Sequence, residues 1–536
     1  MPSPTTWQEK AQQKRTTAAA KIPVEWLIPS SDLTRLQATY TNMLSIPEQT
    51  GLLTPLDIEI TSTGSATALL SSLASQKYTA EEVTLAFCKR AAIAQQLVSC
   101  LTETFFFEAL TRARALDAHL RTTGRTMGPL HGLPISLKDS FNIASIHTSL
   151  GLVAFLDRPP ASQNSSLVTV LLAAGAVLYV KTNIPQTMMT CDSENHVFGR
   201  VLNPYRTNLT AGGSSGGEGA LLALRGSILG VGTDVAGSIR IPALCCGGVG
   251  FKPSAGRVPY GGVAGSGRPG LVGGIPAVAG PMGHEVRDME LFMRTVCEAR
   301  ARAEDVDDGV VGMRWKLKIG WYREDASRPL HPNMARTMKR AVARLQGAGH
   351  TVVDITDLMP SMADANAMAW RLFSMDPDRT AEGHLRRSGE PPIASLKISY
   401  PVEESLPEPS LRELYDLNVR KDDIAARVRR LWLQNDLDVI LAPGYQSCAV
   451  PHDTYGMPVY TVFFSLIDYP ACVLPFGKAD ALQDLHEARD VDYVPAYKPE
   501  EVEGAPCHIQ LVGRRMKDEL LVQHAKVVEA VLRGGY

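Results

Sequence analysis

The chain has 536 residues, of which 45% are hydrophobic and 21% charged, and its formal net charge is −2. These proportions are ordinary for a globular protein, and the length is enough to bury a large core and enclose a pocket. The near-neutral charge lacks the basic excess that phosphate binding requires, which argues against a nucleic acid partner.

Helical patterns dominate the first part of the chain. Thr79 and Glu82 have the spacing of a capping box, in which each side chain bonds a backbone N–H at the start of a helix. Val83 and Phe87 follow at helical spacing and predict the buried face of that helix. The apolar residues of 105–120 recur at the same period, so we expect a second helix there.

From about residue 128 onward, short apolar runs alternate with glycine-rich turns and helical patterns. Alternation of this kind indicates parallel strands joined by helical crossovers. The expected pairs are a helix over 167–174 with a strand over 176–181, and a helix over 218–225, ended by Gly226, with a strand over 229–233.

The second half of the chain contains similar units and one long irregular stretch. Residues 254–283 are rich in glycine without a repeat, and we expect a surface loop there. Residues 332–354 predict a helix followed by a strand. Ser410 and Glu413 are placed to cap a further helix, and residues 439–442 predict a strand.

Residues 376–410 are polar and rich in proline and charge, so we expect them to leave the core and consider them a candidate lid. No internal repeat or linker is recognisable along the chain. We therefore expect a single domain over 1–536, whose N-terminal region, about 1–125, is helical.

Cysteine and histidine usage argues against disulfides and metals. The nine cysteines are an odd number without C-x-x-C spacing, and the twelve histidines are dispersed. The N-terminus lacks the apolar core of a signal peptide, and the longest apolar stretch, 167–180, is too short for a bilayer span of about 20 residues. We expect a soluble cytoplasmic protein with no cofactor, no metal and no membrane partner.

Three segments carry candidate catalytic residues. Lys138 ends an apolar run; it can act as a base if burial lowers its pKa, and otherwise is a surface lysine at a strand end. Ser214 lies in a Gly/Ser cluster that could be a linker or a phosphate cradle, although no P-loop pattern accompanies it. Ser238 is either a helix N-cap or a nucleophile on a strand-to-helix turn. Spacing alone does not decide between these.

Taken together and in this order, the segments around these three residues resemble the amidase-signature family. The resemblance implies a Ser–Ser–Lys triad in which Lys138 is the base, Ser214 is the bridging serine, reached through a cis peptide bond, and Ser238 is the nucleophile. It further implies an oxyanion hole formed by the backbone N–H groups of Val235, Ala236, Gly237 and Ser238.

The similarity extends beyond the triad. Agreement is good over about 79–283, with a signature core over about 126–283. The stretch 181–188 matches the strand and loop that line the family's pocket, so Met188 and Met189 are expected to bind substrate, with a core-packing role as the alternative. Ala236 stands where most members have glycine. That departure and the stretch 188–195 are similar to a fungal acetamidase-like subgroup.

The family resemblance also implies a fold and an activity. The fold is one α/β/α domain with a central mixed β-sheet flanked by helices. The activity is that of an amidase, which hydrolyses a small-molecule carboxylic amide through an acyl-enzyme. Carbamate or ester hydrolysis is left open, and so are an amidotransferase A-type subunit and a non-catalytic binding protein. The sequence around Glu218 favours a hydrolase over the subunit, and a homodimer is left open.

Overall fold

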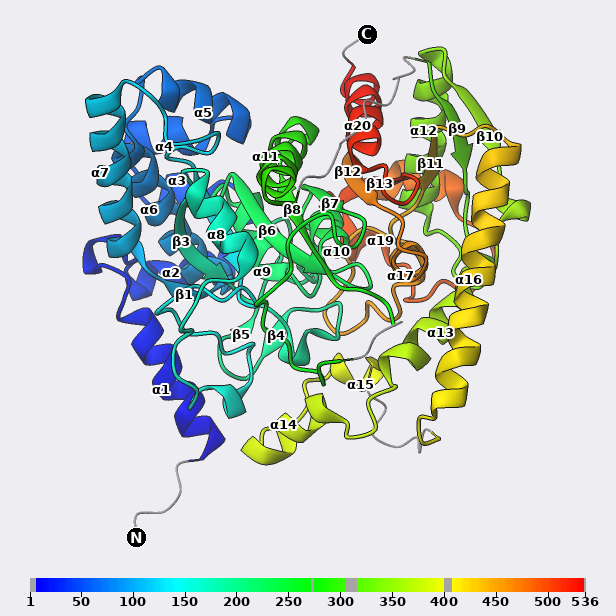
Figure 1. Ribbon diagram of the computed structural model, residues 1–536, viewed down its shortest axis with the longest axis horizontal. Helices are drawn as coiled ribbons and strands as arrows, with labels where there is room; N and C mark the ends of the chain where they lie inside the picture. Colours follow the sequence, from blue (N-terminus) through cyan, green and yellow to red (C-terminus); the bar gives the residue numbers. More distant parts are fainter. Residues whose placement is uncertain (1–5, 271–273, 305–315, 400–406, 535–536) are drawn as a thin grey trace.

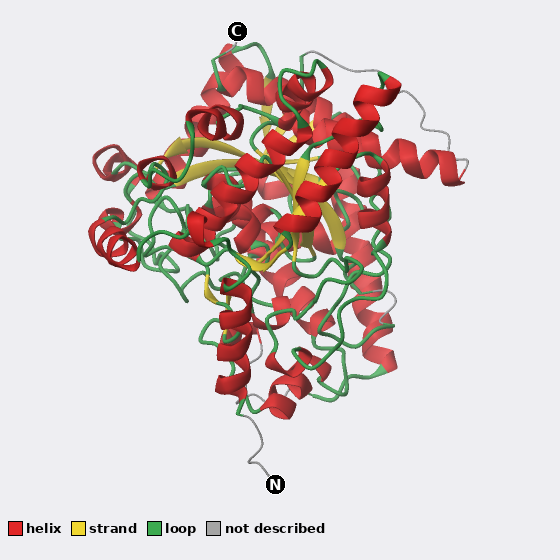
Figure 2. Ribbon diagram, turned by 90° about the vertical axis from the view of Figure 1, so that its left-hand side faces the viewer, coloured by secondary structure: helices red, strands yellow, loops and turns green. Residues whose placement is uncertain are grey.

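The computed structural model describes residues 6–270, 274–304, 316–399 and 407–534. A large β-sheet crosses the molecule, and helices lie on both sides of it, as the strands between helices show (Figure 2). Figure 1 follows the chain from the N-terminal helices at the left of the view to the C-terminal helix at its top, near the middle. The architecture confirms the expected α/β fold with a central mixed sheet, whereas the single-domain organisation stays a prediction.

Within the described residues, eleven strands form the large sheet, in the order β1-β3-β2-β6-β8-β7-β12-β13-β11-β9-β10, and β4 and β5 form a separate pair. The strands are β1 (Leu101–Thr104), β2 (Pro134–Lys138), β3 (Val177–Thr182), β4 (Glu194–Asn195), β5 (Gly199–Arg200), β6 (Leu229–Asp234), β7 (Val249–Lys252), β8 (Val278–Gly283), β9 (Lys318–Trp321), β10 (Thr351–Asp354), β11 (Val439–Ala442), β12 (Ala471–Lys478) and β13 (Pro506–Val512).

The helices cover the sheet and extend beyond its ends. They are α1 (Trp7–Ala19), α2 (Ser30–Thr39), α3 (Ile46–Gln49), α4 (Pro55–Thr61), α5 (Ala66–Ala74), α6 (Ala80–Val98), α7 (Phe106–Thr123), α8 (Ser166–Ala173), α9 (Gly216–Ala223), α10 (Arg240–Cys245), α11 (Val286–Glu304), α12 (Pro332–Gly347), α13 (Met362–Phe373), α14 (Thr380–Ser388), α15 (Leu396–Ser399), α16 (Leu411–Gln434), α17 (Val459–Leu466), α18 (Ala481–Asp484), α19 (Pro499–Val502) and α20 (Asp518–Leu532). No helix in the described ranges is long and apolar enough to cross a membrane.

Strand direction is mixed. β2 runs parallel to both β3 and β6, and β9 runs parallel to both β10 and β11, while the other pairs in the large sheet are antiparallel. The crossovers predicted from the sequence are confirmed at α8–β3 and α9–β6. Because β2, β3 and β6 are parallel, their carboxyl ends meet at one edge of the sheet, where ligand sites of such sheets commonly lie.

The capping signals predict helix starts correctly. The Thr79 hydroxyl accepts from the backbone N–H of Glu82 at the start of α6, and the reciprocal bond is present. Val83 and Phe87 are fully buried. The Ser410 side chain likewise caps α16. The expected elements over 105–120, 332–354 and 439–442 are confirmed as α7, α12 with β10, and β11.

Two expectations are wrong in detail. The stretch 254–283 ends in a strand, because β8 is fully buried between β6 and β7. Glycines in this stretch weaken the strand pattern in the sequence. The structure requires one of them, because a Cβ on Gly280 would lie 2.2 Å from the Phe251 carbonyl oxygen of the neighbouring strand. The helix expected over 218–225 ends at Ala223, and Arg225 rather than Gly226 takes the left-handed conformation, at φ 58°.

The segment after residue 376 packs back onto the core near the site described below. Leu385 and Ile393 are buried in a cluster that Met188 and Met189 join. Glu390 accepts hydrogen bonds from the Val153 backbone N–H and the Gln186 side chain, at 2.8 Å and 3.0 Å. Residues 400–406 of the expected excursion lie outside the described ranges. Its role as a lid stays a prediction.

Candidate active site

Lys138 ends β2 at the sheet edge where the parallel strands meet. Its side chain is fully buried, and Nζ lies 2.7 Å from the Ser214 Oγ. The same nitrogen lies 2.8 Å from Oγ1 and 3.4 Å from the carbonyl oxygen of Thr233, which is on β6. The interpretation of Lys138 as an exposed strand-end lysine is therefore wrong.

Burial sets the proton affinity of this lysine. Loss of water around the ammonium lowers the pKa of Lys138 from 10.5 to about 7, against the opposing charges of Asp234 and Glu218. Asp139, adjacent in sequence, forms an ion pair with Lys181 at 3.3 Å instead. An extended backbone sends these neighbouring side chains to opposite faces. Lys138 can therefore be neutral near physiological pH.

Ser214 lies in a tight turn that leads into α9. The Gly213–Ser214 peptide bond is cis. A Cβ on Gly213 would lie 2.4 Å from the Thr190 carbonyl oxygen, so a side chain at that position would displace backbone. The cluster is therefore a packed element rather than a flexible linker, and it presents the Ser214 hydroxyl to Lys138.

Ser238 lies on the turn between β6 and α10. The Ser215 backbone N–H donates to the Ser238 carbonyl oxygen at 3.2 Å, which brings the second and third sequence segments together. The N-cap position of α10 is Ile239, and no side chain caps the helix, so Ser238 is not the cap. Within the described part of the chain its hydroxyl forms no hydrogen bond, including none with Ser214, and is free to meet a ligand.

A buried ion pair braces this turn. The Asp234 carboxylate binds the Arg240 guanidinium through Nε and Nη2, both at 3.0 Å. The same carboxylate accepts from the backbone N–H groups of Gly237 and Ile239, at 2.8 Å and 3.2 Å. Paired charge lowers the pKa of Asp234 although burial opposes this effect. The motif contains both residues, but their bracing role depends on three-dimensional contacts and was missed from the sequence.

The four expected oxyanion donors are not equivalent. The Gly237 N–H is bonded to Asp234, whereas the N–H groups of Val235, Ala236 and Ser238 donate to no group among the described residues. Gly237 has φ 137°, and a Cβ there would lie 2.3 Å from the Thr461 Oγ1, so glycine is required. The turn thus offers unbonded N–H groups beside the Ser238 hydroxyl, as oxyanion stabilisation requires.

Met188 ends the short 3₁₀ turn Gln186–Met188, and Met189 follows it. Both are half-buried, and they pack against the apolar cluster that contains Leu385 and Ile393. Met188 has a φ of 63°. This packing agrees with the core alternative for the two methionines, and their contact with substrate stays a prediction.

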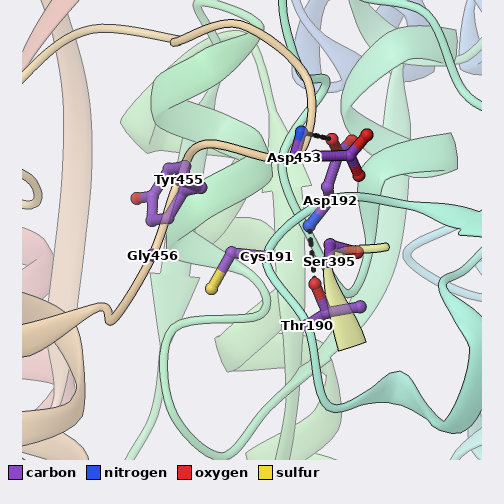
Figure 3. A pocket seen from close by; sticks show the side chains of 7 residues that line it. All are labelled: Thr190, Cys191, Asp192, Ser395, Asp453, Tyr455 and Gly456. Atoms are coloured by element: carbon purple, nitrogen blue, oxygen red, sulfur yellow. Dashed lines mark hydrogen bonds between the residues drawn. The ribbon is translucent and has the colours of Figure 1, made fainter. Parts of the chain in front are cut away.

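The residues that follow Met189 in the chain contribute to a hollow, whose lining side chains Figure 3 shows. It is lined by Thr190, Cys191, Asp192, Ser395, Asp453, Tyr455 and Gly456. Thr190 and Cys191 form the backbone wall against Gly213, whose added Cβ would lie 2.4 Å and 2.9 Å from their atoms. The hollow is therefore adjacent to the segment that carries Ser214. Sequence reasoning noted 188–195 only as a subgroup similarity and did not identify this hollow.

Comparison with known proteins agrees with this geometry. A family model described as Amidase matches residues 82–522. An amidase of Gibberella moniliformis is 39% identical over 98% of this chain and 99% of its own length, and an acetamidase of Aspergillus oryzae is 35% identical over 99% and 100%. A solved fatty acid amide hydrolase is 30% identical, with a TM-score of 0.90 over 98% of this chain and 95% of that one.

Proposed function

The chain belongs to the amidase family of amide hydrolases, and from that premise we propose that it works through a Ser–Ser–Lys triad of Lys138, Ser214 and Ser238 with an acyl-enzyme. One observation carries the assignment: Lys138 is fully buried, has no carboxylate within salt-bridge distance among the described residues, and contacts the Ser214 hydroxyl at 2.7 Å. A buried lysine of this kind is a base rather than a structural cation.

The reaction begins with two proton transfers. Neutral Lys138 accepts the proton of the Ser214 hydroxyl while Ser214 accepts that of Ser238, whose Oγ attacks the amide carbonyl carbon. The carbonyl oxygen becomes an oxyanion next to the free N–H groups of Val235, Ala236 and Ser238. A donor of this kind is worth about 3–4 kcal/mol in the transition state of comparable hydrolases.

Collapse of the tetrahedral intermediate expels the amine. Lys138 returns its proton through Ser214 to the leaving nitrogen, and the C–N bond breaks to leave an ester on Ser238. Water then attacks that ester by the same proton path and releases the carboxylate. The path requires a Ser238–Ser214 hydrogen bond, which we expect to form when substrate fills the site, because catalytic hydrogen bonds often tighten only in the complex.

The substrate is proposed to be a small-molecule carboxylic amide. Two relatives of similar length are named acetamidases, which supports a short acyl group for this chain. Met188 and Met189 are proposed to border the acyl pocket, since flexible thioether side chains adapt to varied apolar groups. The expected cytoplasmic location and the choice between monomer and homodimer remain proposals, to be tested by fractionation and by light scattering.

The test combines covalent labelling with a substrate panel. A fluorophosphonate probe should label the protein, and peptide mapping should locate the adduct on Ser238. Aliphatic amides, aryl amides, carbamates, esters and glutamine are then compared by product detection. Labelling elsewhere, or turnover of glutamine that depends on a copurifying subunit, would contradict the proposal. Carbamate or ester turnover that exceeds amide turnover would change the proposed substrate class but keep the triad.

A further inference from the structure

A second buried ionisable group lies close to the triad and has no part in the reaction as written. Glu218 is in the first turn of α9, and its side chain is fully buried. Its Oε2 accepts from the Ser136 hydroxyl at 2.6 Å, and its Oε1 accepts from the Thr182 hydroxyl at 2.8 Å. No ion pair within the described ranges includes this carboxylate, which is unusual because buried acids are normally paired.

Two contacts join β2 to the start of α9 and the turn that precedes it. Lys138 contacts Ser214, and Ser136 donates to Glu218. Ser136 and Lys138 are two residues apart on one strand, so their side chains share a face and their Cα atoms are separated by roughly 6.6 Å. The Ser136–Glu218 contact is therefore separated from the Lys138–Ser214 contact by about the two-residue repeat of a strand, and both lie on the same side of the sheet.

The backbone of β6 closes the space around the carboxylate. A Cβ on Gly230 would lie 2.1 Å from Glu218 Oε2, so glycine at that position is what admits the acid. Burial raises the pKa of Glu218 to about 7, while the bonds from Ser136 and Thr182 and the charge of Lys138 oppose the rise. The group can therefore carry charge in the pH range in which Lys138 titrates.

The other titratable groups near Glu218 and Lys138 are either neutral near pH 7 or already paired with another charge, so Glu218 faces Lys138 as its cation. Cys100 and Tyr179 lie close to Glu218, and burial raises the pKa of each, so both are neutral near pH 7. From β6, Asp234 faces Lys138, but its charge is held by Arg240 and influenced by Lys252. Of Asp234 and Glu218, the two acids that act on Lys138, Glu218 is the one to which no arginine or lysine of the described ranges is bonded.

We propose that Glu218 is a positioning residue for the reaction: its buried carboxylate supplies a negative charge that stabilises the protonated form of Lys138. The inference rests on the proposed function of Lys138 as the base. Removal of that charge should make the ammonium form less favourable and move the rise of activity to lower pH. A unit charge about one strand repeat away in a protein interior changes the pKa of the neighbouring group by roughly one to two units.

The experiment compares kcat/KM against pH for the wild type, Glu218→Gln and Glu218→Asp. Glutamine keeps the shape but removes the charge, so the midpoint should fall by about one unit or more. A one-unit fall raises the fraction of plateau activity about fivefold at one unit below the wild-type midpoint. Glu218→Asp keeps the charge, so its midpoint should stay near that of the wild type even where thermal stability is lower.

Further variants distinguish a variant that does not fold, an incorrect role for Glu218 and an incorrect triad. Ser136→Ala removes one donor to the carboxylate, which favours neutral Glu218, so its midpoint should fall by less; it tests the idea even where Glu218→Gln does not fold. An unchanged midpoint in Glu218→Gln, or equal midpoints in the glutamine and aspartate variants that both differ from the wild type, would overturn the inference. Lys138→Ala distinguishes a failure of the proposed triad from a failure of this inference. Full activity of that variant contradicts the triad. If that variant is inactive and the Glu218 variants keep the wild-type midpoint, only the role of Glu218 is contradicted.

Discussion

The pH dependence of activity tests the environment of Lys138 directly. With its pKa lowered from 10.5 to about 7, half of the lysine is neutral at pH 7. A solvated lysine of the ordinary pKa is neutral at that pH in only about one molecule in 3,000, so burial increases the active form roughly 1,500-fold, equivalent to about 4 kcal/mol. We therefore expect kcat/KM to rise tenfold per pH unit below a midpoint near pH 7 and to be constant above it.

The assay is kcat/KM for an amide substrate between pH 5.5 and 9.5, in buffers of constant ionic strength. Lys138→Ala should lose most activity together with the pH-dependent rise. Lys138→Arg should restore neither, because a guanidinium does not deprotonate in proteins. A rise centred near pH 10, or a Lys138→Ala enzyme with the wild-type rate and profile, would refute the reasoning.

The lowered pKa of Lys138 also predicts how the free energy of unfolding changes with pH, and the sign of that change can be checked without substrate. Between pH 8 and 10 the unfolded chain holds a proton on Lys138 that the folded protein does not, so folded-state stability rises with pH by about 1.4 kcal/mol per unit from this group. Lys138→Met lacks that contribution. Its stability relative to the wild type should therefore fall from pH 8 to pH 10 in thermal unfolding, and equal differences at the two pH values would contradict a lowered pKa.

Three further predictions concern the two serines and the turn. Ser238→Ala should abolish hydrolysis and fluorophosphonate labelling with an unchanged melting temperature; retained turnover would reject the nucleophile. Ser214→Ala should reduce amide turnover more than turnover of activated esters, whose leaving groups need less protonation, and equal losses would indicate a shape role only. Gly237→Ala should lower both the melting temperature and activity, because its Cβ would lie 2.3 Å from Thr461 Oγ1 at φ 137°, whereas Ala236→Gly should stay active. A Gly237→Ala variant with wild-type melting and rate would show that the turn tolerates the side chain.

Local signals in the sequence predict much of the architecture. Hydroxyl caps predict the starts of α6 and α16, because a helix start depends on residues only three apart, and apolar periodicity predicts α7. The alternation of helices and strands predicts the parallel arrangement of β2, β3 and β6. β8 escapes the same reasoning because glycine and proline obscure its strand pattern, and only packing against β6 and β7 makes those residues suitable.

The sequence by itself determined which side chains are candidates for chemistry: Lys138, Ser214 and Ser238 lie in motifs whose residue types suit acyl transfer. The tertiary structure decided whether they can act together. Burial of the lysine and its 2.7 Å contact with Ser214 arise from a strand and a loop distant in sequence, and the brace of Asp234 by Arg240, six residues further along, depends on how the turn between them folds. Desolvation and charge pairing depend on which atoms surround a group in space, and no local pattern of residues encodes that surrounding.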